Sequence, residues 1–393
     1  MNIPMSSPEI NDSDIQAVNE VLESSYLSIG PKNKAFEEAV ANYAGTNFGI
    51  SVNSGTSGLH LAVISAGVED KDLVITTPFS FIASANCILF ERAIPVFVDI
   101  DPLTFNIDPV QVVQATKDLI SGGKAAERWL PPKIKGNKTK KNNLKAILPV
   151  DAFGQPADYD PIKDIANQYD LKVIEDSCEA LGAEYKGQKA GSLGDVGVFA
   201  FYPNKQMTTG EGGILVTDNE EWSNLFRSLR NQGRDIFDAW LNHTRLGYNY
   251  RLDEMSAALG QSQLKRLDGL LEKRARVAAW YAERLESVAG LQTPEIAPTT
   301  TRMSWFVYVV RVTAVFGRNQ LMERLNEAGI PSRPYFSPIH LQPFYMNKFG
   351  YNRGDFPETE LAGDQCLALP FSSVMTEDQV DYVCKTIIDI IIE

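Results

Sequence analysis

From residue 9 to about residue 230, helical segments alternate with short apolar runs that are rich in β-branched residues. Such runs, apolar on both faces and separated by helices, are typical of a mainly parallel sheet that helices cover on both sides. The pattern therefore predicts an α/β layer fold. The predicted strands are LVITT (73–77), IPVFVDI (94–100), KAILPVD (145–151), LKVIED (171–176), VGVFAFY (196–202) and GILVTD (213–218).

The pattern changes after GYNYRLDE (247–254). Residues 253 to about 288 carry apolar positions at helical spacing, which predicts one long helix that tolerates Gly260 and Gly269 at some cost. We therefore expect a large α/β domain over residues 1–250, and a connecting helix with a smaller α/β domain over 251–393. The expected parts of the smaller domain are a strand (304–313), a helix (318–329), a proline-rich stretch (330–343) and a final helix (376–392).

Residues 121–145 stand apart, because they are lysine-rich, carry paired prolines and show no apolar period. This composition predicts a solvated excursion between a helix and a strand.

Length and charge narrow the class of protein. A chain of 393 residues with 44% hydrophobic and 22% charged residues indicates a globular protein of about two domains. The net charge of −13 would repel a phosphate backbone, so we expect no nucleic acid partner. The start MNIPMSSPEI has no basic and apolar leader pattern, and no run approaches the roughly 18 apolar residues of a membrane span. We expect a cytoplasmic protein with no membrane partner.

The four cysteines lie far apart and do not cluster with the three histidines. This spacing predicts reduced structural thiols and no metal site.

A first candidate site lies in VNSGTSGLHLAVISAG (52–67), where Ser-Gly-Thr-Ser precedes a helical pattern. Free backbone N–H groups at a helix N-terminus, with hydroxyls beside them, can bind an anion such as a phosphate. An ordinary N-cap has the same residue types, so this stretch alone leaves both interpretations open.

Two further stretches follow predicted strands. In PFSFIASAN (78–86), Phe79 and Phe81 lie between a predicted strand end and a helix. Aromatic residues at this position either pack in the core or stack on a cofactor. VIEDSCEALGAEYKG (173–187) places Glu175 and Asp176 at a strand end, where their side chains point to opposite faces, so only one can enter a given site.

The last stretch is FYPNKQMTTGEGG (201–213). Pro203 and Asn204 end a predicted strand, Lys205 follows, and glycines turn the chain into the next strand. Alone, this indicates a hairpin with an exposed lysine. Together with a phosphate site, an aromatic face and a carboxylate, it suits pyridoxal 5′-phosphate (PLP), which needs a lysine, an acidic partner for its pyridinium nitrogen and a phosphate anchor.

These stretches resemble the sugar aminotransferases of PLP fold type I, the DegT/DnrJ group. The resemblance runs in family order from about residue 5 to 370 and implies a large domain with a seven-stranded, mainly parallel sheet. The matching blocks are SGTSGLHLA, PFSFIASAN, IPVFVDIDPLTFNID, FGQPADYDPI, EDSCEALGAEYKGQKAGSLGD, FYPNKQMTTGEGG, GYNYRLDEMSAALG and RPYFSPIHLQPFY.

The resemblance also implies residue roles. Lys205 matches the lysine of the internal aldimine, Asp176 the acid that pairs with the pyridine nitrogen, and Phe81 the aromatic that stacks on the ring. His340, in RPYFSPIH, matches a segment that faces the sugar.

Gly55, Thr56 and Ser57 match the phosphate-binding turn. Asn249 matches a residue that reaches the phosphate from the neighbouring subunit, which implies a homodimer with shared active sites.

Two positions depart from the family pattern. Ala200 stands where many relatives carry serine, so one hydroxyl to the phosphate is missing. Glu179 stands where relatives often carry glutamine or histidine near the ring oxygen of the cofactor, and a carboxylate there would repel a phenolate unless it were protonated or turned away.

By resemblance, the expected activity is transfer of an amino group from an amino acid, L-glutamate, to a nucleotide-linked ketosugar in ping-pong half reactions, as in polysaccharide biosynthesis. Two alternatives stay open: a sugar dehydratase of the same fold, and a non-catalytic PLP-binding regulator. Dehydrating relatives carry histidine in place of the lysine, so Lys205 favours transamination.

Overall fold

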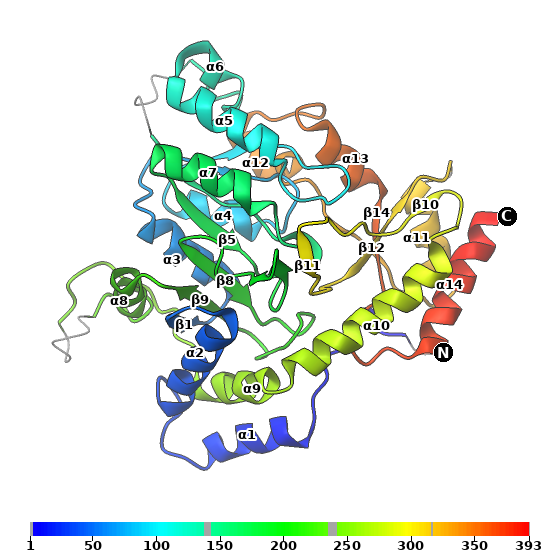
Figure 1. Cartoon of the computed structure of the whole chain (residues 1–393), viewed down its shortest axis with the longest axis horizontal. Coiled ribbons are helices and arrows are strands. Elements are labelled where there is room, and N and C mark those ends of the chain that lie inside the picture. The colour runs from blue at the N-terminus through cyan, green and yellow to red at the C-terminus, as the bar shows by residue number, and fades with distance from the viewer. Residues whose placement is uncertain (1–2, 137–142, 235–241, 316, 393) are drawn as a thin grey trace.

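A seven-stranded sheet forms the centre of this computed structural model, which describes residues 3–136, 143–234, 242–315 and 317–392. The strands follow the spatial order β1-β9-β8-β5-β4-β2-β3, and Figure 1 labels β1, β9, β8 and β5 of this series. Only β9 is reversed, because it pairs antiparallel with β8 and β1 while the other pairs are parallel. The strands are β1 (Phe48–Val52), β2 (Leu73–Thr76), β3 (Ile94–Phe97), β4 (Leu144–Ile147), β5 (Lys172–Asp176), β8 (Val196–Ala200) and β9 (Gly213–Thr217).

Each of the six predicted apolar runs overlaps one of these strands, so the predicted α/β fold with a mainly parallel sheet is confirmed. Strand β1 lies outside the predicted runs, because Gly49 and Ser51 interrupt its apolar pattern. A β-carbon at Gly49 would lie 2.4 Å from the main-chain oxygen of Glu37, so close packing of α2 on β1 requires the glycine.

Helices cover both faces of the sheet, which is why its strands are apolar throughout. On one face, α3 (Gly55–Ser65), α4 (Ala83–Phe90) and α8 (Glu220–Leu229) share a core with the strands. On the other face lie α2 (Pro31–Ala44), α5 (Pro109–Ser121) and α7 (Tyr159–Tyr169).

A second, antiparallel sheet in the order β10-β12-β14-β13 forms the smaller α/β unit. Its core lies against one half of α10 and against α11 and α14. The strands are β10 (Leu291–Gln292), β12 (Tyr308–Val312), β13 (Arg333–Pro334) and β14 (Cys366–Leu369), and the helices are α10 (Leu267–Leu285), α11 (Gly317–Glu327) and α14 (Glu377–Ile392).

The remaining elements join these two cores. Ile3 packs into the core of the smaller unit, whereas Ile339, Tyr345 and Phe349 pack into the core of the large sheet, so the packing crosses the expected boundary at residue 250 in both directions. The connecting elements are α1 (Asp12–Leu22), α6 (Gly123–Glu127), η1 (Ala152–Gly154), the hairpin β6 (Glu184–Tyr185) and β7 (Gln188–Lys189) with β11 (Thr300–Arg302), α9 (Glu254–Leu264), η2 (Ile339–Leu341), α12 (Pro343–Phe349) and α13 (Pro357–Gln365).

The single long helix predicted over residues 253–288 is wrong, because α9 ends at Leu264 and α10 begins at Leu267. Arg266 has φ −118° and ψ 13°, outside the helical range. Its guanidinium reaches α1 and the segment before it, with bonds of 2.6 Å to Asp14 and 3.0 Å to Glu9. The helix is thus interrupted at Arg266, and the ion pairs with Glu9 and Asp14 hold this residue in place.

Residues 121–145 are only partly the solvated excursion that was predicted. The short helix α6 lies within them, and Ala126 and Leu130 are buried in the core of the large sheet. Residues 137–142 of this segment lie outside the described residues.

The described part of the chain contains no helix that is long and apolar enough to cross a bilayer, and no group of three or more acidic, histidine or cysteine side chains arranged for a metal ion. The four cysteines are free thiols, as predicted.

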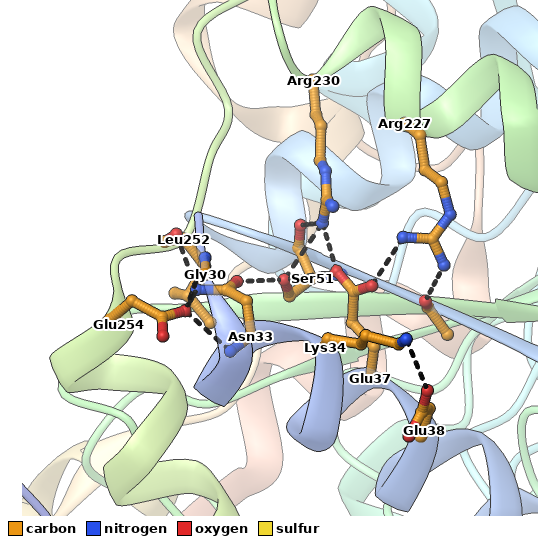
Figure 2. A network of polar contacts seen from close by, with 11 residues as sticks. Gly30, Asn33, Lys34, Glu37, Glu38, Ser51, Arg227, Arg230, Leu252 and Glu254 are labelled. Atoms are coloured by element: carbon orange, nitrogen blue, oxygen red, sulfur yellow. Dashed lines mark hydrogen bonds and ion pairs between the residues drawn. The ribbon is translucent and has the colours of Figure 1, made fainter. Parts of the chain in front are cut away.

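A buried polar network fixes β1 to the helices around it (Figure 2). The Glu37 carboxylate accepts hydrogen bonds from Ser51 N (3.0 Å) and Arg227 Nη1 (2.7 Å), and it also pairs with Arg230. Burial alone would raise the pKa of Glu37, but the charges of Arg230 and Arg227 outweigh it and hold the pKa below its ordinary value. The ionised carboxylate thus ties α2 and α8 to the strand that leads into α3.

The same network continues to α9. Glu254 accepts hydrogen bonds from the backbone N–H groups of Gly30 (2.9 Å), Lys32 (2.7 Å) and Asn33 (2.8 Å) at the N-terminus of α2. A carboxylate at this position satisfies N–H groups that lack helical partners and complements the helix dipole.

We predict that Glu37→Gln lowers the free energy of unfolding by about 3 kcal/mol at pH 7, because it leaves buried arginines without their anion. Since the folded state lowers the pKa of Glu37, its contribution is present above the ordinary pKa of 4.5 and is lost as the pH falls through the folded value. Urea unfolding of both proteins should therefore show their difference shrinking in acid.

Glu38→Gln is the matched control, because Glu38 is an exposed neighbour whose only ion pair, within the described chain, is 3.9 Å long (Figure 2). It should leave the unfolding midpoint unchanged. An equal effect of the two substitutions would contradict the assigned role of Glu37.

Candidate active site

The N-terminus of α3 lies against the carboxyl ends of two central strands. A β-carbon at Gly55 would lie 2.8 Å from the β-carbon of Ala200, at the end of β8, and 2.9 Å from Sγ of Cys178, just after β5. Gly213 is equally close, since a β-carbon there would lie 2.6 Å from the carbonyl carbon of Ser54. Ligands of such sheets bind beyond the carboxyl ends of the strands. The glycines at 55 and 213 therefore bring the turn onto the edge where chemistry is expected.

The turn itself presents backbone donors. Ser54 is the N-cap, and its Oγ accepts a hydrogen bond from Ser57 N (3.1 Å), while Ser57 Oγ donates to Asn53 (2.7 Å). The N–H groups of Gly55 and Thr56 have no partner within the helix. They form a site for an anion, which the positive end of the helix dipole favours.

Asp176 faces this region from the end of β5. Its Oδ2 accepts a hydrogen bond of 2.5 Å from Ser84 Oγ, and its Oδ1 accepts one of 3.3 Å from Cys178 N. Ser84 lies one helical turn after Phe81, whose side chain remains exposed (63%). An exposed aromatic face thus lies one turn from the residue that holds the carboxylate.

The neighbouring Glu175 points to the other face, as the alternation of a strand requires. It accepts hydrogen bonds from the N–H groups of Gly191 (2.7 Å), Leu193 (2.5 Å) and Gly194 (2.5 Å). Burial raises the pKa of Glu175 to about 8. Only Asp176 of this pair therefore enters the site.

Lys205 lies in the turn after β8 and is not the exposed hairpin lysine that the sequence left open. Its side chain is only 13% exposed, with Nζ 3.5 Å from Glu179 Oε1 and 3.8 Å from the centre of the Phe306 ring. The ammonium thus has one anion and one aromatic face as neighbours. Gly210 begins the return to β9 with a φ of 82°, a left-handed value that glycine adopts without strain.

Glu179 is turned toward Lys205. Its Oε2 accepts a hydrogen bond from Phe153 N (3.0 Å), and its main-chain oxygen accepts one from Gln206 Nε2 (2.5 Å). Burial raises the pKa of Glu179, although the charge of Lys205 opposes the shift. The carboxyl group is therefore held in place and biased toward its neutral form.

Arg274, on α10, was not predicted as a site residue. It is buried and donates hydrogen bonds to the main-chain oxygens of Lys205 (2.7 Å), Asn204 (3.3 Å), Phe306 (3.1 Å) and Trp305 (3.2 Å). No carboxylate in the described ranges pairs with it, and burial lowers the pKa of Arg274 to about 10. One guanidinium thus joins the lysine turn to the segment that carries Phe306.

A sequence signal for Arg274 exists. The buried positions of α10 include Leu267, Leu270, Leu271, Val277 and Ala278, and position 274 falls on the same helical stripe. A cation on an apolar stripe must find buried partners. Ser84 offers no such signal, because only the fold shows that its hydroxyl reaches Asp176.

Asn249 and His340 lie apart from this group. Asn249 is exposed, and its main-chain oxygen lies 3.4 Å from Asn53 Nδ2, beside the turn of its own chain. His340 is fully buried in η2, with Nε2 3.0 Å from Glu360 Oε1. Its ring is therefore not exposed in the described structure, and a contact of His340 with the sugar stays a prediction.

The residues fit PLP. The N–H groups of Gly55 and Thr56, with Ser57, suit a phosphate. Asp176 suits a pyridinium nitrogen, and Lys205 supplies a primary amine. Cys178 connects these parts, since it bonds to Asp176, lies against Gly55 and interacts electrostatically with Lys205.

Comparison with known proteins gives a consistent result. The sequence profile of the DegT/DnrJ/EryC1/StrS aminotransferase family matches residues 8–388. The chain is 35% identical over 394 residues to the GDP-perosamine synthase of Caulobacter vibrioides, with 99% of this chain and 98% of that protein covered. It is also 35% identical over 396 residues to a pleiotropic regulatory protein of Geobacillus stearothermophilus, with 98% of each covered.

Among solved structures, the chain resembles DesV of S. venezuelae, determined in complex with a ketimine intermediate. The TM-score is 0.88 at 30% identity, and the match covers 100% of this chain and 99% of that one.

We predict that Arg274→Met lowers the free energy of unfolding by about 3 kcal/mol, because buried main-chain oxygens lose their donor. Arg276→Met is the control, since Arg276 is exposed on the same helix. Chemical denaturation of both variants provides the measurement, and equal midpoints for the two would contradict the clamping role of Arg274.

Proposed function

The chain belongs to the DegT/DnrJ/EryC1/StrS aminotransferase family, and from that premise we propose that it moves an amino group from L-glutamate to a keto group of a nucleotide-linked sugar. Sugar aminotransferase activity and dependence on PLP follow from the family and its relatives. The donor, the nucleotide and a cytoplasmic location are our proposals. Polysaccharide biosynthesis is the context that the relatives support.

The observation that carries the proposal is the meeting of an amine, a carboxylate and an anion site at one sheet edge. Lys205, Asp176 and Gly55 come from three separate segments, yet each interacts with Cys178. A hydrogen-bonding core alone would not leave a nearly buried lysine and a helix N-terminus with free donors on two sides of the same cysteine.

Each residue has a defined part in the proposed reaction. Bound PLP supplies an electron sink that stabilises negative charge on the carbon next to the transferred nitrogen. Asp176, held by Ser84, would place its carboxyl group where a pyridinium nitrogen needs an acidic partner. Gly55 and Thr56 hold the phosphate through their N–H groups, and Phe81 offers its face to the ring.

Lys205 is the proposed general base. Its amine would remove a proton from the α-carbon of the donor and deliver a proton to the cofactor carbon that is bonded to the transferred nitrogen. The keto acid leaves before the sugar enters, so both half reactions use one site and the kinetics should be ping-pong.

We also propose a homodimer in which Asn249 completes the phosphate site of the neighbouring subunit. Support comes from the exposure of Asn249 and from its rigid surroundings, because Asn53 N bonds to Tyr250 O (2.9 Å) and the Tyr250 hydroxyl lies 3.1 Å from His60 Nδ1.

A non-catalytic regulator is the second candidate, because one close relative is known as a regulatory protein. Such a protein would bind PLP without exchanging it with an amino donor. A sugar dehydratase of this family is disfavoured by Lys205, since dehydrating relatives carry histidine there.

We predict that Lys205→Ala abolishes turnover and the visible absorption of the lysine-bound cofactor, because the reacting amine is gone. Steady-state assays with glutamate and a panel of nucleotide-linked ketosugars, together with absorption spectra, provide the measurement. Lys186→Ala is the control, since Lys186 is half exposed and pairs with Asp160. A Lys205→Ala protein that transaminates at nearly the wild-type rate would refute the assignment, and a wild type whose spectrum ignores every amino donor would favour the regulator.

We predict that co-expression of Lys205→Ala and Asn249→Ala chains gives a mixed dimer that is more active than either parent. A mixed dimer would contain one site with both residues intact, provided that Asn249 acts across the interface. The assay is turnover per purified heterodimer, isolated with two affinity tags.

If Asn249 served its own subunit, the mixed dimer would be no more active than the Asn249→Ala parent. A monomer in light scattering would also rule out the shared site.

A further inference from the structure

Lys205 and Glu179 form an ion pair that is almost completely removed from water. The exposed fractions of their side chains are 13% and 8%, and the Nζ–Oε1 distance is 3.5 Å. Two buried charges lose most of their hydration, and only excellent geometry compensates for the loss. At 3.5 Å the pair is longer than the usual charge-assisted hydrogen bond, so the attraction between the two charges offsets only part of their lost hydration.

The carboxyl group is fixed at this position. Phe153 N binds Oε2, which leaves Oε1 for Lys205, and the main chain of Glu179 is tied to Gln206, the residue after the lysine. Gln206 is itself held by Ser304 Oγ at 2.7 Å. The Glu179 carboxyl group therefore keeps its position beside Lys205 whether or not it is charged.

The other ionisable groups around Glu179 act in two directions. Lys205 favours its ionised form, whereas Asp176 and burial favour the neutral one. Tyr335 and Cys178 also interact with it electrostatically, and burial raises the pKa of both, so they remain neutral. Lys205 is the only cation that faces this carboxyl group in the described structure.

We propose that Glu179 is a catalytic residue that accepts a proton from the Lys205 ammonium and holds it while the neutral amine reacts. An N–H bond of the ammonium breaks and an O–H bond of the carboxyl group forms, so an ion pair becomes an amine and an acid without change in total charge. The freed electron pair on Nζ can then attack the aldehyde carbon of the cofactor, and the carbonyl oxygen leaves as water with both amine hydrogens.

This inference rests on the proposed function, because it presumes that the amine meets an aldehyde. It also resolves why a carboxylate stands at this position. A carboxyl group that holds a proton can lie beside a phenolate oxygen, whereas an ionised one would repel it.

The test uses full-length protein from which hydroxylamine has removed the cofactor. This protein is mixed with PLP between pH 6.5 and 9, and the rate at which the visible absorption of the lysine-bound cofactor appears is measured. We expect Glu179→Gln to slow the reaction by about 100-fold at pH 7, because the nearby acceptor is lost. The deficit should shrink toward pH 9, where hydroxide replaces the acceptor. A purely structural role would not produce this pH dependence.

Glu175→Gln is the matched control, because it also removes a buried carboxyl group, but one on the face of β5 that points away from Asp176. This variant should react with PLP at the wild-type rate. If Glu179→Gln does not fold, the test uses Glu179→Ala with added formate, which supplies a carboxylate in place of the missing side chain. Recovery of the rate of reaction with PLP supports the proposal, and no recovery overturns it. A Glu179→Gln rate within about twofold of wild type at every pH would also overturn it. Wild-type protein that gives no band would instead refute the proposed function.

Discussion

The architecture depends on the geometry of one sheet edge, where parallel strands deliver their carboxyl ends to the same place. Side chains from β5, from the turn after β8 and from the start of α3 meet there, although they lie far apart in the chain. That meeting requires β1 to hold its position, because β1 leads directly into α3. The ion pairs of Glu37 with Arg227 and Arg230 supply the anchor on the far side of the same strand.

Charged side chains that are buried at this edge of the sheet need partners, because they lose their hydration. Each ionised group has a partner that fixes it: Asp176 has Ser84, and Lys205 has Glu179 and the face of Phe306. Arg274 is the exception, because its partners in the described structure are main-chain oxygens and the ring of Phe371 rather than a carboxylate. Arg274 therefore holds the main chain of the turn that carries Lys205 against the main chain of the segment that carries Phe306.

The strands could be predicted because runs such as Val196–Ala200 are apolar on both faces. The break between α9 and α10 could not, since it depends on Arg266 reaching Glu9 and Asp14. For the site, local motifs pointed to Lys205, Asp176 and the 55–57 turn. The contacts of Ser84, Glu179 and Arg274 escaped prediction, because each depends on residues that only the folded chain makes neighbours.

Helix α10 has a consequence for how the protein can move. Its first turns pack into the core of the large sheet and its last turns into that of the smaller one, with Arg274 between them. A swing of the smaller unit would pull the guanidinium away from some of its four main-chain oxygens, two of which belong to the turn that carries Lys205. The contacts of Arg274 therefore oppose a hinge motion between the two sheets.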